Sequence, residues 1–414
     1  MPERPWRLVL LAGLAIVAAM ALAVVTLSGD REEAEQPAAV ALPGAGAPRP
    51  SASGDAAGQV RFLRDAESDF DPYLLDSTPE QRSFMRDHYW RLRGYPPTSD
   101  AALDWAPPIH FYADLYALYP GDPADRRLIE EHPQWILRDA QGRRLYVPFD
   151  CSGGTCPAYA ADPGSAGWRA EWIARARAEL EKGYAGVFID NVNMVMRVGD
   201  GLGQEVAPLD PRTGEAMTLA DWQGYVAAFV REIRDAFPRA EIVHNVIWFA
   251  KRSPAVRSEI EAADYVELER GFSDTGIADR QAYSSLLDYV DWVHSLGSSM
   301  ILEPYDLDDQ RRLFELASYF LINEGGDAIA SDFEADPGSW WPGWETDLGS
   351  PQSPRGRVGG ILRRDFERGI VLVNPPGAPQ QSFSLPEGYV DLDGAPVETI
   401  TLGPAQGAIL LGAA

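Results

Sequence analysis

Positive charge is scarce in this sequence. Its 414 residues include 36 Lys and Arg against 62 Asp and Glu, which gives a formal net charge of -26 at pH 7. Proteins that bind phosphate backbones rely on clustered Lys and Arg, so this charge argues against nucleic acid and against anionic surfaces. A neutral or cationic partner fits better, although an acidic surface that only keeps the protein soluble would look the same.

Cysteine is nearly absent. The two cysteines, Cys151 and Cys156, flank a Ser-Gly-Gly-Thr turn in DCSGGTC. In an oxidising compartment this arrangement predicts a local disulfide that holds one loop. A zinc site would need more ligands, and the five histidines of the chain have no metal-type spacing. We therefore expect no metal site.

One long apolar run is present, at the amino terminus. Residues 8–29 are uncharged and almost wholly Leu, Val, Ala and Ile, with Arg4 and Arg7 before them and acidic residues directly after. The run is long enough to span a bilayer, and its flanking charges place the bulk of the chain outside. A cleaved signal peptide is the alternative. The length of the run favours a membrane anchor over residues 1–29, and either interpretation predicts an extracytoplasmic protein.

The rest of the chain divides by composition. Residues 30–58 are rich in Ala, Pro and Gly, which is typical of a flexible linker. Over residues 59–350, short apolar strands alternate with amphipathic helices, the pattern of βα units. The expected strands lie near residues 60–63, 109–115, 144–149, 185–190, 240–245, 264–269, 299–304 and 327–332. Residues 351–414 show only short alternating strands and predict a small all-β domain.

Eight strands with intervening helices predict a (β/α)8 TIM-type barrel. An open, doubly wound sheet is the competing fold. Such a sheet usually carries a Gly-rich phosphate turn after its first strand, and the sequence has none there. The α/β barrel is therefore the preferred fold class.

Polar side chains end several of the expected strands. In a parallel barrel the carboxyl ends of the strands form the mouth of the active site. A single acid at such a position can also be a helix cap, but several together indicate a binding site. The candidates are Tyr112, Asp114, Asp190, Asn191, His244, Asn245, Glu267, Glu269, Glu303 and Tyr305.

Two of these candidates suit glycosidic bond hydrolysis. The reaction needs one carboxyl group that donates a proton and one that attacks or activates water. Asp190 ends the fourth expected strand and Glu269 the sixth, and we choose this pair, with Glu267 as the main rival to Glu269. We expect Asp190 to act as nucleophile or base and Glu269 as proton donor, buried among Phe and Tyr side chains.

Aromatic residues are frequent, and one cluster follows the last expected strand. The segment SWWPGWE at residues 339–345 contains Trp340, Trp341 and Trp344. Apolar faces of sugar rings stack on such side chains, so Trp341 is a candidate for substrate binding. Alternatively, the cluster seals the interface with the C-terminal β domain.

Several segments resemble a known family. These are HPQWILRDAQGRRL, ADPGSAGWRAEWIARARAELEKGYAGVFIDNV, ADYVELERGF and FERGIVLVNP. They resemble the hypothetical glycosyl-hydrolase-like barrel proteins and, more distantly, the endo-α-1,4-polygalactosaminidases. The resemblance implies a TIM-type barrel, a carbohydrate substrate and no cofactor, with Asp190 and Glu269 as the acids that close the fourth and sixth strands. Together with the acidic charge, it suggests a cationic amino-sugar polymer as substrate.

Two other classes of function remain open. A non-catalytic, membrane-tethered barrel that binds a polysaccharide would keep the aromatic residues but would not need both acids, so the presence of Asp190 and Glu269 favours a hydrolase. A polysaccharide lyase would bind an anionic uronate, and the acidity of the chain argues against that substrate. We therefore expect an extracytoplasmic glycoside hydrolase.

Overall fold

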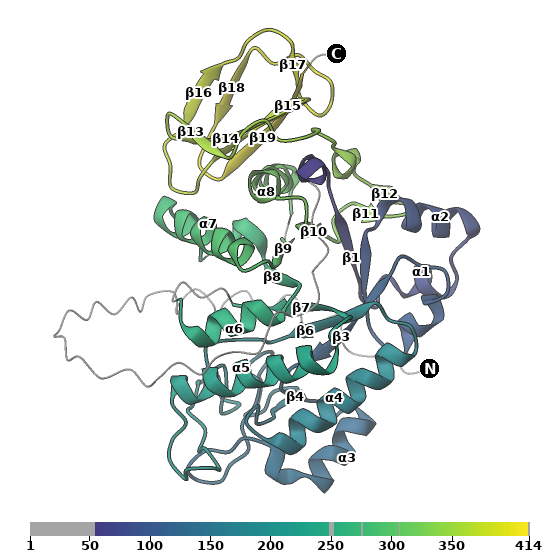
Figure 1. Ribbon diagram of the computed structural model, residues 1–414, viewed down its shortest axis with the longest axis vertical. Coiled ribbons are helices and arrows are strands. Elements are labelled where there is room, and N and C mark those ends of the chain that lie inside the picture. The colour runs from purple at the N-terminus through teal and green to yellow at the C-terminus, as the bar shows by residue number, and fades with distance from the viewer. Residues whose placement is uncertain (1–53, 248–251, 275, 306, 413–414) are drawn as a thin grey trace, which may run out of the picture.

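The computed structural model describes residues 54–247, 252–274, 276–305 and 307–412. Eight parallel strands close into a barrel in the order β1-β10-β9-β8-β7-β6-β3-β2 (Figure 1). The strands are β1 (Phe62–Ala66), β2 (Arg91–Gly94), β3 (Ile109–Asp114), β6 (Gly186–Asp190), β7 (Glu241–Asn245), β8 (Tyr265–Glu269), β9 (Ser299–Glu303) and β10 (Ala328–Ala330). The predicted TIM-type barrel is confirmed.

One expected strand is wrong and one real strand was missed. Residues 144–149 belong to the long connection between β3 and β6, where they form only isolated bridges such as Tyr146 with Tyr159. The missed strand is β2, whose sequence RLRG looks too polar for a barrel strand. Because the two errors offset each other, Asp190 still ends the fourth barrel strand and Glu269 the sixth.

Helices cover the outer face of the barrel (Figure 1). The α-helices of the described residues are α1 (Asp71–Leu75), α2 (Pro79–His88), α3 (Pro123–Glu131), α4 (Ala166–Glu181), α5 (Leu219–Ala236), α6 (Pro254–Ala262), α7 (Arg280–Ser295) and α8 (Asp309–Ile322), of which α3 lies beyond α4. Helix α5 shows why these segments are helical. Thr218 and Asp221 form a capping box at its start, and Trp222 and Phe229 belong to the apolar side that it buries.

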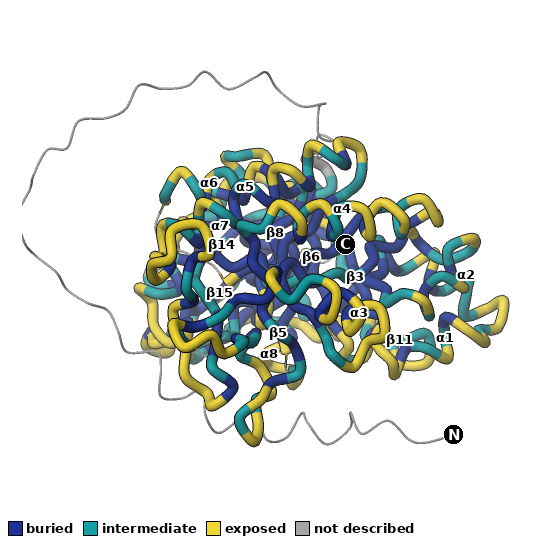
Figure 2. Tube along the Cα trace, turned by 90° about the horizontal axis from the view of Figure 1, so that it is seen from below, coloured by how far each residue is buried: buried dark blue, intermediate teal, exposed yellow. Residues whose placement is uncertain are grey.

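The barrel interior is filled by apolar side chains. One buried cluster combines residues from six of the strands, namely Leu63, Phe188, Val243, Tyr265, Ile301, Ala328 and Ala330. Successive side chains of a strand point to opposite faces, so the alternate residues face the helices instead. Figure 2 shows the buried residues concentrated along the strands and the exposed ones around them. This part of the interior is therefore a packed apolar core.

The C-terminal region forms two antiparallel sheets above α8 (Figure 1). The larger sheet contains β13 (Gly356–Val358), β14 (Ile361–Phe366), β15 (Gly369–Asn374), β19 (Gln406–Gly412) and β17 (Tyr389–Val390), and the smaller contains β16 (Gln381–Ser384) and β18 (Thr399–Leu402). Strand β19 approaches α8 closely at Gly407, where a Cβ atom would lie 2.6 Å from the Cβ of Ala317. The predicted small C-terminal all-β region is confirmed.

The amino-terminal predictions fall mainly on residues outside the described part of the chain. The expected anchor at residues 1–29 and most of the expected linker lie there. The last residues of the predicted linker form a 3-10 turn, η4 (Gly54–Gly58), and Asn323 Nδ2 donates to the carbonyl of Ala57 at 3.1 Å. These residues therefore belong to the folded domain. Among the described helices, none has the length and apolar character needed to cross a membrane.

Candidate active site

The structure brings Asp190 and Glu269 together through a shared neighbour. Asn245, at the end of β7, lies on the strand between the two that carry them. Its Nδ2 atom donates to Asp190 Oδ1 at 2.9 Å and to Glu269 Oε2 at 3.3 Å. Both carboxylates therefore lie at the carboxyl end of the barrel within reach of one amide group, as the strand order predicts. Their catalytic roles stay a prediction.

Asp190 is held by further donors. The hydroxyl of Tyr112 donates to Asp190 Oδ2 at 2.5 Å, and the backbone N–H of Asn191 donates to Oδ1 at 2.7 Å. Hydrogen bonds of this kind fix the orientation of the carboxylate. The Tyr112 ring is itself held by stacking on Tyr95, with ring centroids 4.9 Å apart. Asp190 is thus a well-positioned carboxylate that is only partly exposed.

Asp114 lies beside Asp190 on the neighbouring strand β3. It is buried and accepts hydrogen bonds from the backbone of Tyr116 and Ala117 and, at 2.7 Å, from Asn191 Nδ2. Burial and the adjacent Asp190 charge raise the pKa of Asp114 to about 8. Near neutral pH this carboxyl group therefore carries a proton most of the time, which limits the negative charge at the site.

A buried arginine, Arg93, occupies the floor of the site. Its guanidinium group binds Asp65 at 2.5 Å and Glu267 at 3.0 Å, and it also pairs with Glu303. Three acids around one cation leave excess negative charge. Burial and the neighbouring Glu303 raise the pKa of Glu267, although Arg93 opposes this shift. Glu267, the predicted rival of Glu269, is therefore a buried partner of Arg93.

Asp65 and Arg93 were missed in the sequence, together with Tyr95. Asp65 lies on β1, whose expected extent stopped short of it, and Arg93 lies on the unrecognised strand β2. The Tyr95 hydroxyl donates to Asp65 at 3.4 Å. Arg91, Arg93 and Tyr95 follow one another at every second position, and side chains two residues apart in a strand share a face. This alternation is the sequence signal that could have predicted strand β2.

Glu303 and Tyr305 join the site at the end of β9. Glu303 is buried against Arg93, whereas Tyr305 is 41% exposed. The hydroxyl of Tyr305 donates to Glu303 Oε2 at 3.3 Å. Tyr305 thus rises from the floor of the site toward solvent, where a ligand can reach it.

Two expectations about this site are wrong. His244 lies on the opposite face of β7 from Asn245 and points outward, where its Nδ1 atom lies 3.0 Å from Oε1 of the buried Glu259. The twofold alternation of a strand explains this, since adjacent residues cannot both face the barrel mouth. Glu269, expected to be buried among Phe and Tyr, is exposed instead because it is the last residue of β8.

The tryptophan cluster packs against Phe62 and Arg312, and its expected roles stay predictions. Trp340 and Trp344 pack on Phe62 at the start of β1, with ring centroids 5.0 Å apart in each case. Trp341 lies over the guanidinium group of Arg312 in α8, 4.0 Å from its carbon atom. The cluster therefore covers the outside of the barrel next to β1 and α8, and its contacts do not include the candidate acids.

The backbone is unusual directly after each candidate acid. Asn191 has a φ angle of 60° and Arg270 a φ angle of 73°, both in the left-handed region. Residues other than glycine rarely adopt this conformation, and such positions cluster at functional sites. This feature supports the choice of Asp190 and Glu269 independently of their hydrogen bonds.

Two further predictions concern the cysteines and a metal site. Cys151 and Cys156 form the predicted disulfide. Within the described ranges there is no group of three or more His, Cys, Asp or Glu that could hold a metal ion. At the floor of the site the positive charge among the carboxylates comes from Arg93.

The family model described as hypothetical glycosyl hydrolase family 15 matches residues 114–370, which is more than half of the chain. The chain belongs to this family. Membership in hypothetical glycosyl hydrolase family 15 classifies the protein as a glycoside hydrolase. The matched region begins at Asp114, so it contains Asp190 and Glu269 but leaves out β1 and β2, which supply Asp65 and Arg93.

The solved structures to which this chain is similar include the following three. The glycoside hydrolase domain of PelA from Pseudomonas aeruginosa is 15% identical, over 70% of this chain and 97% of that chain, with a TM-score of 0.40. A GH27 β-L-arabinopyranosidase from Geobacillus stearothermophilus is 9% identical, over 87% and 98% of the two chains, with a TM-score of 0.49. The cyclic α-maltosyl-(1→6)-maltose hydrolase from Arthrobacter globiformis is 14% identical, over 87% and 100%, with a TM-score of 0.44. No curated protein matches the chain.

Proposed function

We propose that this protein is an extracytoplasmic, membrane-anchored glycoside hydrolase that cleaves a polysaccharide with Asp190 and Glu269. The observation that carries the proposal is the Asn245 side chain, which donates to both carboxylates at the mouth of the barrel. Glycoside hydrolysis needs two carboxyl groups at the bond that breaks, and this arrangement supplies them.

Asp190 acts as the nucleophile and Glu269 as the proton donor. Three donors orient Asp190, as a nucleophile requires, whereas Glu269 is exposed and can reach the oxygen of a leaving group. In the first step Asp190 attacks the anomeric carbon while Glu269 protonates the departing oxygen. In the second step Glu269 removes a proton from the water that breaks the glycosyl–enzyme bond.

The short separation supports a retaining reaction. The hydrogen bonds from Asn245 end on the same nitrogen, so the two acceptor oxygens cannot lie farther apart than 2.9 Å and 3.3 Å taken together. Retaining enzymes hold their carboxyl groups about 5 Å apart, whereas inverting enzymes hold them about 6.5 to 9.5 Å apart to leave room for a water molecule. A bridge by one amide nitrogen favours the shorter spacing. We therefore expect the product to keep the anomeric configuration of the substrate.

Charge and compartment refine the proposal. The net charge of -26 favours a cationic amino-sugar polymer over an anionic one. The apolar run at residues 8–29 supports membrane anchoring. The disulfide between Cys151 and Cys156 supports an extracytoplasmic location, because disulfides persist in oxidising compartments.

The experiment that tests this proposal is the release of reducing ends by the full-length chain. Neutral, acidic and partly deacetylated amino-sugar polymers are offered to the wild type, to Asp190→Asn and to Glu269→Gln. We expect one polymer to be cut and each substitution to lower kcat by about 100-fold or more. Asp393→Asn and Glu387→Gln are matched controls, because both acids are exposed in the C-terminal region.

Two outcomes would overturn parts of the proposal. If no polymer is cut while one binds equally well to all of these proteins, the chain is a non-catalytic polysaccharide-binding barrel. If a polymer is cut but NMR of the first product shows the opposite anomeric configuration, the retaining assignment is wrong.

A further inference from the structure

The turn that follows Glu269 is bound by a side chain from a distant part of the sequence. Glu315, in α8, accepts hydrogen bonds from the backbone N–H of Phe272, at 3.0 Å, and from that of Ser273. Both N–H groups belong to the 3-10 turn η7 (Gly271–Ser273), which begins two residues after Glu269. Glu315 is 43 residues away from Phe272 in the sequence, so only the closed barrel brings the two together.

The burial of Glu315 is unusual for an acid in a helix. Its exposed fraction is 0%, and glutamate is almost never fully buried unless it has partners. Burial of a carboxyl group costs free energy that only good hydrogen bonds offset. Its neighbours in α8, Phe314 and Leu316, are buried as well, so an apolar side chain would suit this position for packing alone. The group that this acid binds is the turn, which indicates a role there.

The turn is shaped to receive the carboxyl group of Glu315. Arg270 has a φ angle of 73° and Gly271 a φ angle of 60°, so two successive residues adopt the left-handed conformation. A Cβ atom on Gly271 would lie 2.5 Å from Glu315 Oε2, which is closer than a real contact allows. The glycine in the segment ADYVELERGF therefore has a physical reason, because only a residue without a side chain lets the acid approach.

Two further contacts fix the same turn. Phe272 is fully buried and packs on Tyr283 of α7, with ring centroids 5.2 Å apart. The backbone N–H of Arg270 donates to the carbonyl of Glu303 in β9 at 2.7 Å. Glu269 itself is exposed, so the packing of its own side chain does little to orient it. Its direction depends on the backbone at the end of β8, which this turn holds.

We propose that Glu315 is a positioning residue for Glu269. By binding the N–H groups of Phe272 and Ser273, it fixes the backbone that directs the carboxyl group of Glu269 toward the scissile bond. The inference rests on the proposed function, because it assumes that Glu269 donates the proton. A small displacement of a catalytic group lowers the rate of the chemical step strongly, whereas binding of the polymer does not involve Glu315. Loss of Glu315 should therefore lower kcat and leave KM unchanged.

The test is a double-mutant cycle of Glu315→Gln and Glu269→Gln in the full-length chain. Glu315→Gln replaces one acceptor oxygen with an NH2 group, so only one of the two N–H groups keeps an acceptor. We measure kcat and KM on the polymer that the wild type cleaves. Hydrogen–deuterium exchange of residues 270–274 reports on the turn independently of activity. Glu259→Gln is the matched control, since Glu259 is also a buried glutamate of a helix but lies beside the outward-facing His244.

We expect Glu315→Gln to lower kcat about tenfold without a change in KM, and to speed exchange in the turn. In the Glu269→Gln background the same substitution should have no further effect on kcat, because the group that it positions is already gone. Glu259→Gln should keep the kcat of the wild type and the slow exchange of the turn, even where it lowers stability.

A second variant keeps the test decisive if Glu315→Gln does not fold. Gly271→Ala disturbs the same contact from the side of the turn, so its loss in kcat should also vanish in the Glu269→Gln background. Additive losses in the double variants, or an unchanged kcat in the single ones, overturn the positioning role alone. If no polymer is cut, or if Glu269→Gln keeps the full kcat, the proposed function fails and the positioning role falls with it.

Discussion

At the scale of single residues, the arrangement of the candidate active site depends on Asn245. Its one nitrogen atom donates to Asp190 and to Glu269, so it sets the distance between two groups of like charge. Preorganised donors of this kind cost no reorganisation during the reaction. Asn245 is therefore a positioning residue as well as a candidate for substrate contact.

Replacement of Asn245 tests this role. We expect Asn245→Ala to lower kcat on the order of 100-fold, because both carboxylates lose their common donor. Asn245→Asp should be at least as harmful, since it adds a third negative charge between them. The measurement is kcat as a function of pH, and a positioning role predicts a change in the shape of the profile for both variants. Full activity with an unchanged profile for Asn245→Ala would contradict the assignment.

At the scale of elements, one arginine joins the C-terminal sheet to the barrel. Arg364 of β14 donates through Nη1 to the carbonyls of Phe320 and Asn323, both at 2.8 Å, at the carboxyl end of α8. The last carbonyls of a helix lack partners within the helix and carry partial negative charge. A buried guanidinium group from a neighbouring strand satisfies them, which couples β14 to α8.

Arg364→Ala should therefore be strongly destabilising. We expect a loss of about 2 to 4 kcal/mol in the free energy of unfolding, because helix carbonyls are left buried without donors. The adjacent Arg363 is the control. It points to the other face of β14 and forms a partly exposed pair with Asp365, so Arg363→Ala should cost no more than about 1 kcal/mol. Chemical denaturation of both variants measures the difference, and similar losses would refute the coupling role.

At the scale of the whole molecule, several buried carboxyl groups share one property. Burial raises the pKa of Glu315 to about 7, and it also raises the pKa values of Asp114, Glu267 and Glu303. In an unfolded chain carboxyl groups titrate near pH 4. Between about pH 4 and pH 8 the folded protein therefore binds more protons than the unfolded chain, and the free energy of unfolding falls as the pH rises.

The protein should accordingly be more stable at pH 5 than at pH 8. Glu315 alone contributes roughly 2 to 3 kcal/mol to this difference, given its pKa of about 7 in the folded state. Glu241 does not oppose the trend, since its pKa is lowered by Arg91 and His110 despite burial and it stays ionised above pH 5. Thermal or chemical unfolding at the two pH values measures the difference. Glu315→Gln should flatten the dependence, and higher stability at pH 8 would disprove the explanation.

Local patterns in the sequence predict much of the fold. Alternation of apolar strands with amphipathic helices depends on neighbouring residues only, and it indicates a barrel with Asp190 and Glu269 at strand ends. The same reasoning fails for β2, because Arg91 and Arg93 look like surface residues until the acids that pair with them are known. For residues 144–149 the error is the reverse, because a barrel strand was predicted where none exists. Alternation of apolar residues does not say which sheet a segment joins.

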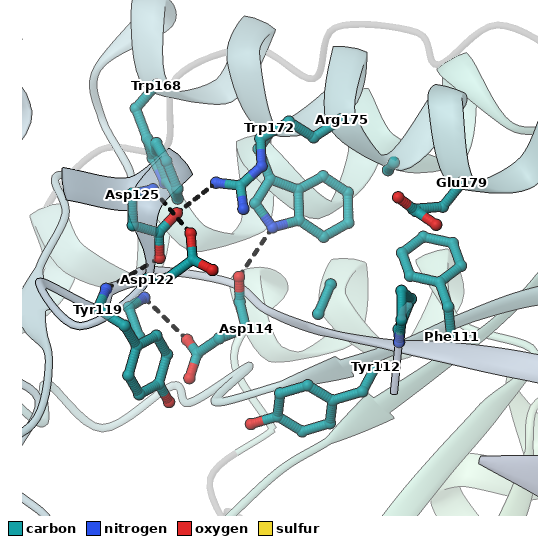
Figure 3. Close-up of a pocket in the computed structure, with 14 residues that line it drawn as sticks. Phe111, Tyr112, Asp114, Tyr119, Asp122, Asp125, Trp168, Trp172, Arg175 and Glu179 are labelled. Carbon is teal, nitrogen blue, oxygen red and sulfur yellow. Dashed lines mark hydrogen bonds and ion pairs between the residues drawn. The ribbon is translucent and has the colours of Figure 1, made fainter. Parts of the chain in front are cut away.

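The sequence by itself therefore determined the class of fold, the family and the two candidate acids. Only the tertiary structure decided which face of β7 carries Asn245 and which carries His244, that Glu267 pairs with Arg93, and that Glu269 is exposed. It also decided that a recess of about 400 Å³ opens between β3 and α4 (Figure 3). The physical reason is that these features arise from contacts between segments far apart in the chain, and such contacts exist only once the barrel has closed.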